Sequence, residues 1–200
     1  MTCLIGLIQD GQAYIGADGY ATTEDGERKP IIARKIFTSG KYLVAFSGHI
    51  RTGQLLYPES GFEFPDDIYQ IPNHMYLWLR EFEVIGKDEA QMGMICCNLM
   101  IAYNNKLYEI MADMQISEID PTVGYTALGS GTQFAMGNLY ATSHFSMGAK
   151  ERIQMALDVA SEFTGSCGPP YYIYSYNEAM KSLKSTLYKH KKTRTKKKSS

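Results

Sequence analysis

Residues 2–19 read TCLIGLIQDGQAYIGADG and hold two β-rich runs on either side of the dipeptide Asp10-Gly11. An Asp-Gly pair between two such runs is a strong signal for a two-residue hairpin turn. The first run is apolar on both faces, with Cys3, Ile5 and Leu7 on one and Leu4, Gly6 and Ile8 on the other. Because a strand of this kind is covered on both sides, the sequence predicts a core strand at the very start of the chain.

Further hairpins and helices follow this first pair of strands. Beyond a polar stretch at 22–29, strands are predicted within 31–48, within 96–113 around Asn104-Asn105, at 125–131 and at 169–176. Helices are predicted at 49–57, 74–86, 132–144, 148–163 and 177–190, and the proline-rich segment 58–73 is predicted to be a loop. Strands joined by hairpins form antiparallel sheets, so the pattern indicates an α+β fold with helices packed outside the sheets.

The charge of the chain is divided between two regions. The formal net charge is −1, yet residues 181–200 carry nine Lys or Arg and no acidic residue. We therefore predict one domain at 1–180 and a basic tail at 181–200. The tail lacks interleaved aromatic residues after Tyr188, so a docking or solubilising role is favoured over nucleic-acid binding.

Composition also indicates where the protein acts. A hydrophobic content of 44% is enough for a sizeable core, and no apolar run approaches the roughly 20 residues that span a bilayer. The cysteines lack metal-ligand spacing, and Cys96 and Cys97 are adjacent, which favours reduced structural thiols. These features predict a cytoplasmic protein with no metal, no cofactor and no membrane partner.

The first hairpin brings a carboxylate close to Thr2. A two-residue turn at Asp10-Gly11 makes paired residue numbers sum to 21, which places Thr2 opposite Gly19 and Cys3 opposite Asp18. The Asp18 side chain then lies on the Cys3 face, so it is expected to orient the backbone or Lys35 rather than to touch the Thr2 hydroxyl. A threonine becomes a nucleophile when a base takes its proton, and its own α-amine is one such base. Removal of Met1 would expose that amine.

Two more residues extend this hypothesis. Lys35 is expected to point into an apolar interior, where it needs a partner such as Asp18 and would lower the pKa of a nearby amine. Gly48 follows an apolar strand and is a candidate N–H donor for an oxyanion. Taken one at a time, Asp18, Lys35 and Gly48 each have an ordinary structural interpretation. They would be a turn aspartate, a lysine that reaches solvent and a glycine that ends a strand, respectively.

In combination these residues resemble a known family. Thr2, GADG at 16–19, ARKIF at 33–37, AFSG at 45–48 and ALGSG at 127–131 occur in the order and near the spacing of proteasome β-subunits. The chain is most similar to the bacterial HslV-type peptidases and their proteasome-like relatives in bacteria and phages. The resemblance covers roughly residues 2–57 and 125–175.

The resemblance implies a fold, a mechanism and partners. The implied fold is the four-layer αββα sandwich of N-terminal nucleophile (Ntn) hydrolases, with two antiparallel sheets between helix layers. Thr2 is implied to be the nucleophile of a threonine-type endopeptidase, Asp18 and Lys35 to tune its amine, Gly48 to form the oxyanion hole and Ser130 to orient the terminus. Family members form homo-oligomeric rings that degrade polypeptides, often with an ATP-dependent unfoldase.

Some positions depart from the family pattern. Where proteasome subunits carry an Asp and a Ser behind the site, residues 161–172 read SEFTGSCGPPYY, in which Glu162 and Ser166 are the candidates. Cys3 is interpreted as a core thiol, and His49 as a residue at the rim of the site. Two alternatives stay open: an Ntn amidohydrolase acting on small amides, and a non-catalytic ring-forming subunit.

Overall fold

The predicted first hairpin is present. In the computed structural model, which describes residues 2–22, 28–30, 34–85 and 94–183, strands β1 (Cys3–Gln9) and β2 (Gln12–Asp18) pair antiparallel. Their register runs from Gln9 opposite Gln12 to Leu4 opposite Ala17, as the turn predicts. Asp10 and Gly11 have φ values of 52° and 70°, the left-handed conformation that a tight hairpin turn requires.

This hairpin is the centre of the first sheet. Strand β10 (Tyr125–Gly129) pairs with β1, and β11 (Tyr171–Ser175) pairs with β2, which gives the order β10-β1-β2-β11. All of these pairings are antiparallel. The start of β1 therefore has a strand on each side, with Cys3 opposite Gly129 of β10 and Leu4 opposite Ala17 of β2.

The second sheet has five antiparallel strands in chain order. They are β5 (Ile36–Ser39), β6 (Tyr42–Gly48), β7 (Cys97–Tyr103), β8 (Lys106–Ile110) and β9 (Ile116–Glu118). The predicted turn at Asn104-Asn105 joins β7 to β8, with φ values of 50° and 59°. The short strand β9 was not predicted.

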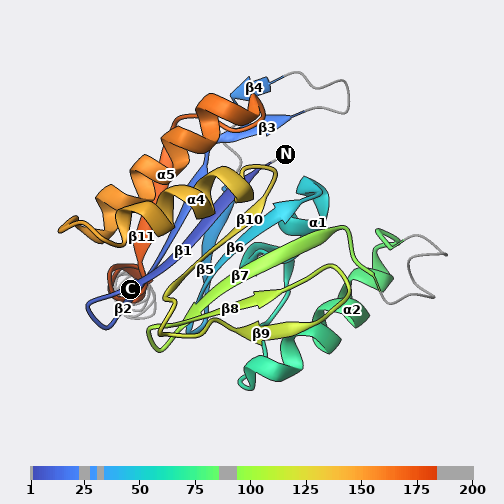
Figure 1. Cartoon of the computed structure of the whole chain (residues 1–200). Helices are drawn as coiled ribbons and strands as arrows, with labels where there is room; N and C mark the ends of the chain where they lie inside the picture. Colours follow the sequence, from blue (N-terminus) through green and yellow to red (C-terminus); the bar gives the residue numbers. More distant parts are fainter. Residues whose placement is uncertain (1, 23–27, 31–33, 86–93, 184–200) are drawn as a thin grey trace, which may run out of the picture.

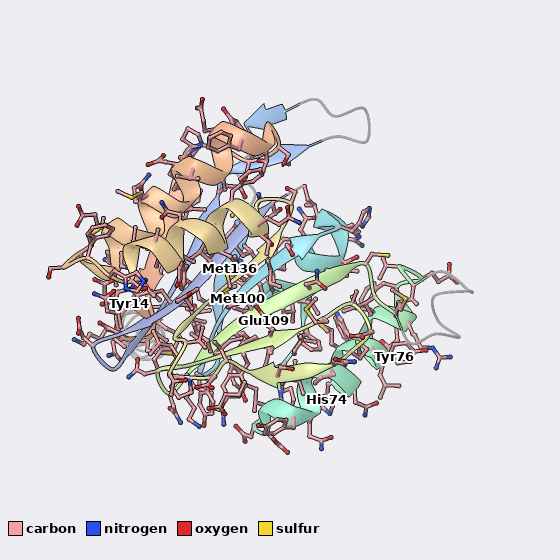
Figure 2. The ribbon with its side chains drawn as sticks, viewed as in Figure 1. Tyr14, His74, Tyr76, Met100, Glu109 and Met136 are labelled. Carbon is pink, nitrogen blue, oxygen red and sulfur yellow. The ribbon has the colours of Figure 1, made fainter. Side chains whose placement is uncertain are left out.

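The two sheets face each other across a buried apolar layer. Side chains that fill it include Leu4, Ile15, Leu43, Met100 and Leu107. Figure 2 shows Met100 and Glu109 near the middle of the molecule. The hydroxyl of Thr126, in the first sheet, donates a hydrogen bond to Glu109, in the second, and burial raises the pKa of Glu109. This bond ties the two sheets together.

Helices cover the outer face of each sheet. Helices α4 (Thr132–Thr142) and α5 (Ala149–Thr164) lie over the first sheet, and α1 (Ile50–Gln54) and α2 (Ile71–Glu81) pack on the second (Figure 1). The predicted stripe of α5 is buried against β1, and its members are Ile153, Ala156, Leu157 and Ala160. The four-layer αββα arrangement predicted from the sequence is confirmed.

The segment 58–73 differs from the predicted loop. It holds the short 3₁₀ helices η1 (Pro58–Ser60) and η2 (Ile68–Gln70), and α2 begins at Ile71, three residues earlier than predicted. Pro72 occupies the first turn of α2, where a missing N–H costs little. Phe62 and Ile68 are buried in the apolar cluster between α2 and the second sheet, here called the outer core. Their burial anchors the segment. Pro72 is thus compatible with the start of α2.

Two smaller regions complete the described chain. Strands β3 (Tyr20–Thr22) and β4 (Arg28–Pro30), which were not predicted, lie at the two ends of the polar stretch 22–29 and pair with each other. Residues 176–183 are helical and cross the predicted domain end, while 184–200, the rest of the predicted basic tail, lie outside the described residues. No helix in the described part of the chain has the length and apolar character to cross a membrane.

The packing of α5 on β1 gives a stability prediction. Replacing the fully buried Ile153 by Ala should lower the free energy of unfolding by about 2–5 kcal/mol, because it removes apolar side-chain atoms from the core and leaves a cavity. The neighbouring exposed Gln154→Ala should change it by less than about 0.5 kcal/mol. Urea unfolding followed by circular dichroism measures both. Equal losses in the two variants would contradict the packing described here.

Candidate active site

Thr2 lies immediately before β1 and is buried, with 5% of its surface exposed. Its carbonyl oxygen accepts a hydrogen bond of 3.3 Å from the hydroxyl of Ser130. On the neighbouring strand Gly129 has a φ of 99°, and a Cβ atom there would overlap the carbonyl oxygen of Thr2. Position 129 therefore requires glycine, and the backbone of Thr2 is fixed by contacts from the segment 129–130.

The Asp18 carboxylate connects the end of β2 to three groups. Oδ1 accepts hydrogen bonds from the backbone N–H of Cys3, at 2.9 Å, and from Lys35 Nζ, at 2.7 Å. Oδ2 accepts one from the backbone N–H of Tyr20, at 3.2 Å. The expected orientation of Asp18 toward the backbone and Lys35 is confirmed. The carboxylate thereby fixes the peptide group that follows Thr2.

Lys35 and Asp18 form a buried ion pair. Their side chains are 3% and 0% exposed. Burial lowers the pKa of Lys35, because a buried ammonium loses its hydration, and the Asp18 carboxylate acts in the opposite direction. Lys35 lies just before β5, and its carbonyl oxygen accepts a hydrogen bond from Phe46 of β6. The pair therefore joins the second sheet to the first beside Thr2.

Ser130 has a second partner that the sequence left open. Its hydroxyl lies 2.9 Å from that of Ser166, which is buried in the connection between α5 and β11. The same connection is tied to the end of β2, because Gly19 donates a backbone hydrogen bond to the carbonyl of Gly168. The other candidate, Glu162, is exposed on α5. Of the two candidates from this region, the structure brings Ser166 to the Thr2 end.

Gly48 ends β6 in a conformation that glycine favours. Its φ is 109°, and a Cβ atom there would lie 2.5 Å from the carbonyl oxygen of Cys96. The next residue, His49, is exposed and donates its backbone N–H to that same carbonyl. Strand β6 contacts β1, which begins just after Thr2, and β10, which ends just before Ser130. Gly48 thus ends the apolar strand β6, as the sequence predicts.

The four cysteines, all within the described residues, form no disulfide, and Cys96 alone of the four is exposed. Within the ranges that the structure describes, no group of three His, Cys, Asp or Glu side chains has an arrangement that would hold a metal ion. The hydrogen bonds around Thr2 connect a carboxylate, an ammonium group and two serine hydroxyls.

Comparison with solved structures identifies this architecture. BPH of Thiobacillus denitrificans superposes with a TM-score of 0.75 at 21% identity, over 86% of this chain and 96% of that one. The same protein has been solved in complex with epoxomicin. The fold is that of the proteasome-like Ntn hydrolases.

Two other proteasome-like proteins share this Ntn fold. HslV of Trypanosoma brucei has a TM-score of 0.64 at 16% identity, over 86% of this chain and 98% of that one. Anbu of Pseudomonas aeruginosa, solved as a helical assembly, has a TM-score of 0.65 at 14% identity, over 87% of this chain and 80% of that one. No protein-family model and no curated protein matches the sequence. The resemblance read from the sequence motifs is thus confirmed at the level of the Ntn fold.

The buried ion pair of this Ntn fold gives a second prediction. Asp18→Asn should lower the free energy of unfolding by about 3–5 kcal/mol, because it leaves the Lys35 ammonium buried without its anion. Adding Lys35→Met should recover at least about 1 kcal/mol of that loss. Glu59→Gln breaks the exposed ion pair of Arg34 and should cost less than about 1 kcal/mol.

Urea unfolding of these variants measures each change. A double variant that is less stable than Asp18→Asn alone would show that the cost does not come from the uncompensated ammonium.

Proposed function

We propose that this protein is a threonine-type endopeptidase in which Thr2 is the nucleophile. The observation that carries the proposal is the buried Asp18–Lys35 ion pair, hydrogen-bonded to the backbone N–H that follows Thr2. Withdrawing two charges from water is costly, and apolar side chains would fill the same space. A charged pair next to a rigidly held threonine supports a chemical role.

The mechanism requires that Thr2 carry a free α-amine. Once Met1 is removed, the amine takes the hydroxyl proton of Thr2, and the hydroxyl oxygen attacks the carbonyl carbon of a substrate peptide bond. The positive charge of Lys35 keeps the amine neutral by disfavouring a second cation nearby. Ser130 holds the carbonyl of Thr2, which limits rotation of the residue while it reacts.

The remaining steps stabilise the oxyanion, transfer a proton to the leaving amine and hydrolyse the acyl ester. The attacked carbonyl oxygen becomes an oxyanion, for which the backbone N–H of Gly48 is the proposed donor. When the C–N bond breaks, the protonated amine gives its proton to the leaving amine, and an acyl ester on Thr2 remains. Water then attacks the ester, with the amine again as base, and the freed acid restores the Thr2 hydroxyl.

The proposal extends to substrates, assembly and location. A related fold is solved with epoxomicin and another as a helical assembly, which supports polypeptide substrates and self-association. Homo-oligomeric rings are the form of assembly that we propose. An ATP-dependent unfoldase is the proposed partner that would supply unfolded chains. The free cysteines suit the reducing cytoplasm. In this proposal 1–180 is the catalytic domain and 181–200 is a basic docking or solubilising tail.

Labelling by epoxomicin and hydrolysis of fluorogenic peptides test the proposed nucleophile. Thr2→Ala should abolish both, because the attacking oxygen is gone, while size-exclusion chromatography shows an unchanged assembly. Thr122→Ala, at an exposed threonine far along the chain, should retain both. Labelling that persists in Thr2→Ala would place the nucleophile elsewhere.

Intact mass spectrometry of the purified protein tests the terminus independently. Loss of Met1 is expected, because the α-amine of Thr2 must be free. A chain that quantitatively keeps Met1 and still hydrolyses peptides would contradict the amine mechanism. If the trimmed protein assembles without hydrolysing peptides or small amides, the non-catalytic ring subunit is the better interpretation; hydrolysis of small amides alone would favour the amidohydrolase.

A further inference from the structure

A groove lies along strand β5, at one edge of the second sheet. Its volume is about 640 Å³, within the range of roughly 300–1,000 Å³ that is typical of ligand pockets. The groove is lined by β5 on one side and by helical residues of 176–183 on the other. Ile36, Leu43 and Ala179 line it and belong to the apolar layer between the two sheets. The proposed reaction of Thr2 uses none of these three side chains.

Strand β5 has a neighbouring strand on one side only. It is the first strand in the order β5-β6-β7-β8-β9, and within the described residues only β6 pairs with it. Phe46 of β6 donates its backbone N–H to the carbonyl oxygen of Lys35. Because bonded residues alternate along an antiparallel ladder, Lys35 and Phe37 bond to β6. The backbone N–H and C=O groups of Ile36 and Thr38 therefore point the other way, toward the open edge.

The two residues with outward-facing backbone groups, Ile36 and Thr38, both line the groove. An open strand edge binds another extended chain, because its donors and acceptors repeat at the spacing of a polypeptide backbone. Side chains of the added strand point alternately to its two faces, so those on one face would lie against Ile36 and Leu43. The groove thus combines backbone groups that bind any extended chain with an apolar surface that accepts its side chains.

The charged side chains at the rim of the groove compensate one another. Arg34, Glu59 and Glu178 line the groove. Arg34 forms an exposed ion pair with Glu59, at 2.8 Å, and Lys150 forms one with Glu178, at 2.9 Å. These four side chains therefore leave no net charge to select an anionic or a cationic ligand. A polypeptide backbone with apolar side chains fits this rim better than a charged molecule does.

Strand β5 leads to the Thr2 end of the molecule. Lys35 directly precedes Ile36, the first residue of β5. The Lys35 ammonium bonds to Asp18, which also holds the backbone N–H that follows Thr2. A chain that lies along β5 and continues past Ile36 therefore leaves the groove at the end of the sandwich where the proposed nucleophile lies. The groove is thus placed to hold one part of a long chain while another part reaches Thr2.

We propose that this groove is a docking site for an extended, apolar segment of a polypeptide substrate, which adds to the edge of β5 as a further strand. The identity of the occupant rests on the proposed peptidase function. Docking of an unfolded chain does not require cleavage and is measured without it. Since an extended chain spans about 3.3 Å per residue, a peptide of about three residues cannot fill the groove and reach Thr2 at once. The docking site therefore favours long chains.

Hydrogen exchange at single-residue resolution tests the docking in full-length Thr2→Ala protein, in which a bound chain is not cleaved. The probe is β-casein, an unfolded polypeptide. Exchange of the Ile36 and Thr38 amides should slow at least about tenfold when β-casein is added, because both N–H groups gain an acceptor. The Phe37 amide, which already bonds to β6, should exchange at an unchanged rate.

Thr38→Pro removes one outward-facing donor. Proline has no N–H, and an edge strand tolerates it where that group points away from the partner strand. In the Thr2→Ala background, Thr38→Pro should weaken binding of fluorescein-labelled β-casein at least about fivefold, as measured by fluorescence anisotropy. The matched control Thr38→Ala keeps the N–H and should bind within about twofold of the parent. With Thr2 restored, Thr38→Pro should lower the ratio of β-casein turnover to short-peptide turnover.

The outcomes separate the docking site from the proposed reaction. Protection of other strands with Ile36 and Thr38 unchanged would overturn the docking site, and so would equal binding by Thr38→Pro and Thr38→Ala. Amides of Ile36 and Thr38 that are already protected without β-casein would also overturn it, because a second copy or another segment then occupies the edge.

Should Thr38→Pro fail to fold, the exchange measurement decides alone. Absence of hydrolysis by the unaltered protein would count against the proposed peptidase. Protection of Ile36 and Thr38 by β-casein would still establish the groove as a site for extended chains.

Discussion

The arrangement around Thr2 depends on one carboxylate. Asp18 accepts hydrogen bonds from the backbone of Cys3 and Tyr20 and forms an ion pair with Lys35. An uncompensated charge in this place would be costly, because the site excludes water. The ion pair therefore constrains both sheets: β2 brings the anion, the segment before β5 brings the cation, and the start of β1 is held between them.

Much of this geometry could be predicted because hairpin turns fix register. Asp10-Gly11 sets every pair along β1 and β2, so the face on which the Asp18 side chain lies follows from counting residues. The need of a buried ammonium for an anion then links Lys35 to Asp18. The helix stripe of α5 and the turn at Asn104-Asn105 follow equally local rules. Where one turn or one period determines a position, the sequence predicts it well.

Positions set by tertiary packing could not be predicted in this way. Ser166 reaches Ser130 because the connection after α5 folds back along the end of β2, and no local pattern indicates that path. The early start of α2 accompanies the burial of Ile68 and Ile71 in the outer core, and Pro72 is compatible with that start because it lies in the first turn. The short strand β9 has three residues and little pattern of its own. Each of these features needs partners far away in the sequence.

The same tight packing explains why small residues surround the nucleophile and why sulfur is next to it. A Cβ atom at Gly131 would lie 2.8 Å from the Cys3 sulfur, so α4 begins directly against that side chain. Position 3 must therefore be small and apolar, and a thiol satisfies both requirements. Cys167, in the connection that follows α5, is buried in the same apolar cluster as Cys3. The packing that holds Thr2 at the start of β1 is thus the same packing that buries both thiols under α4 and α5, so the rigidity of the site and the small size of its neighbours have the same physical origin.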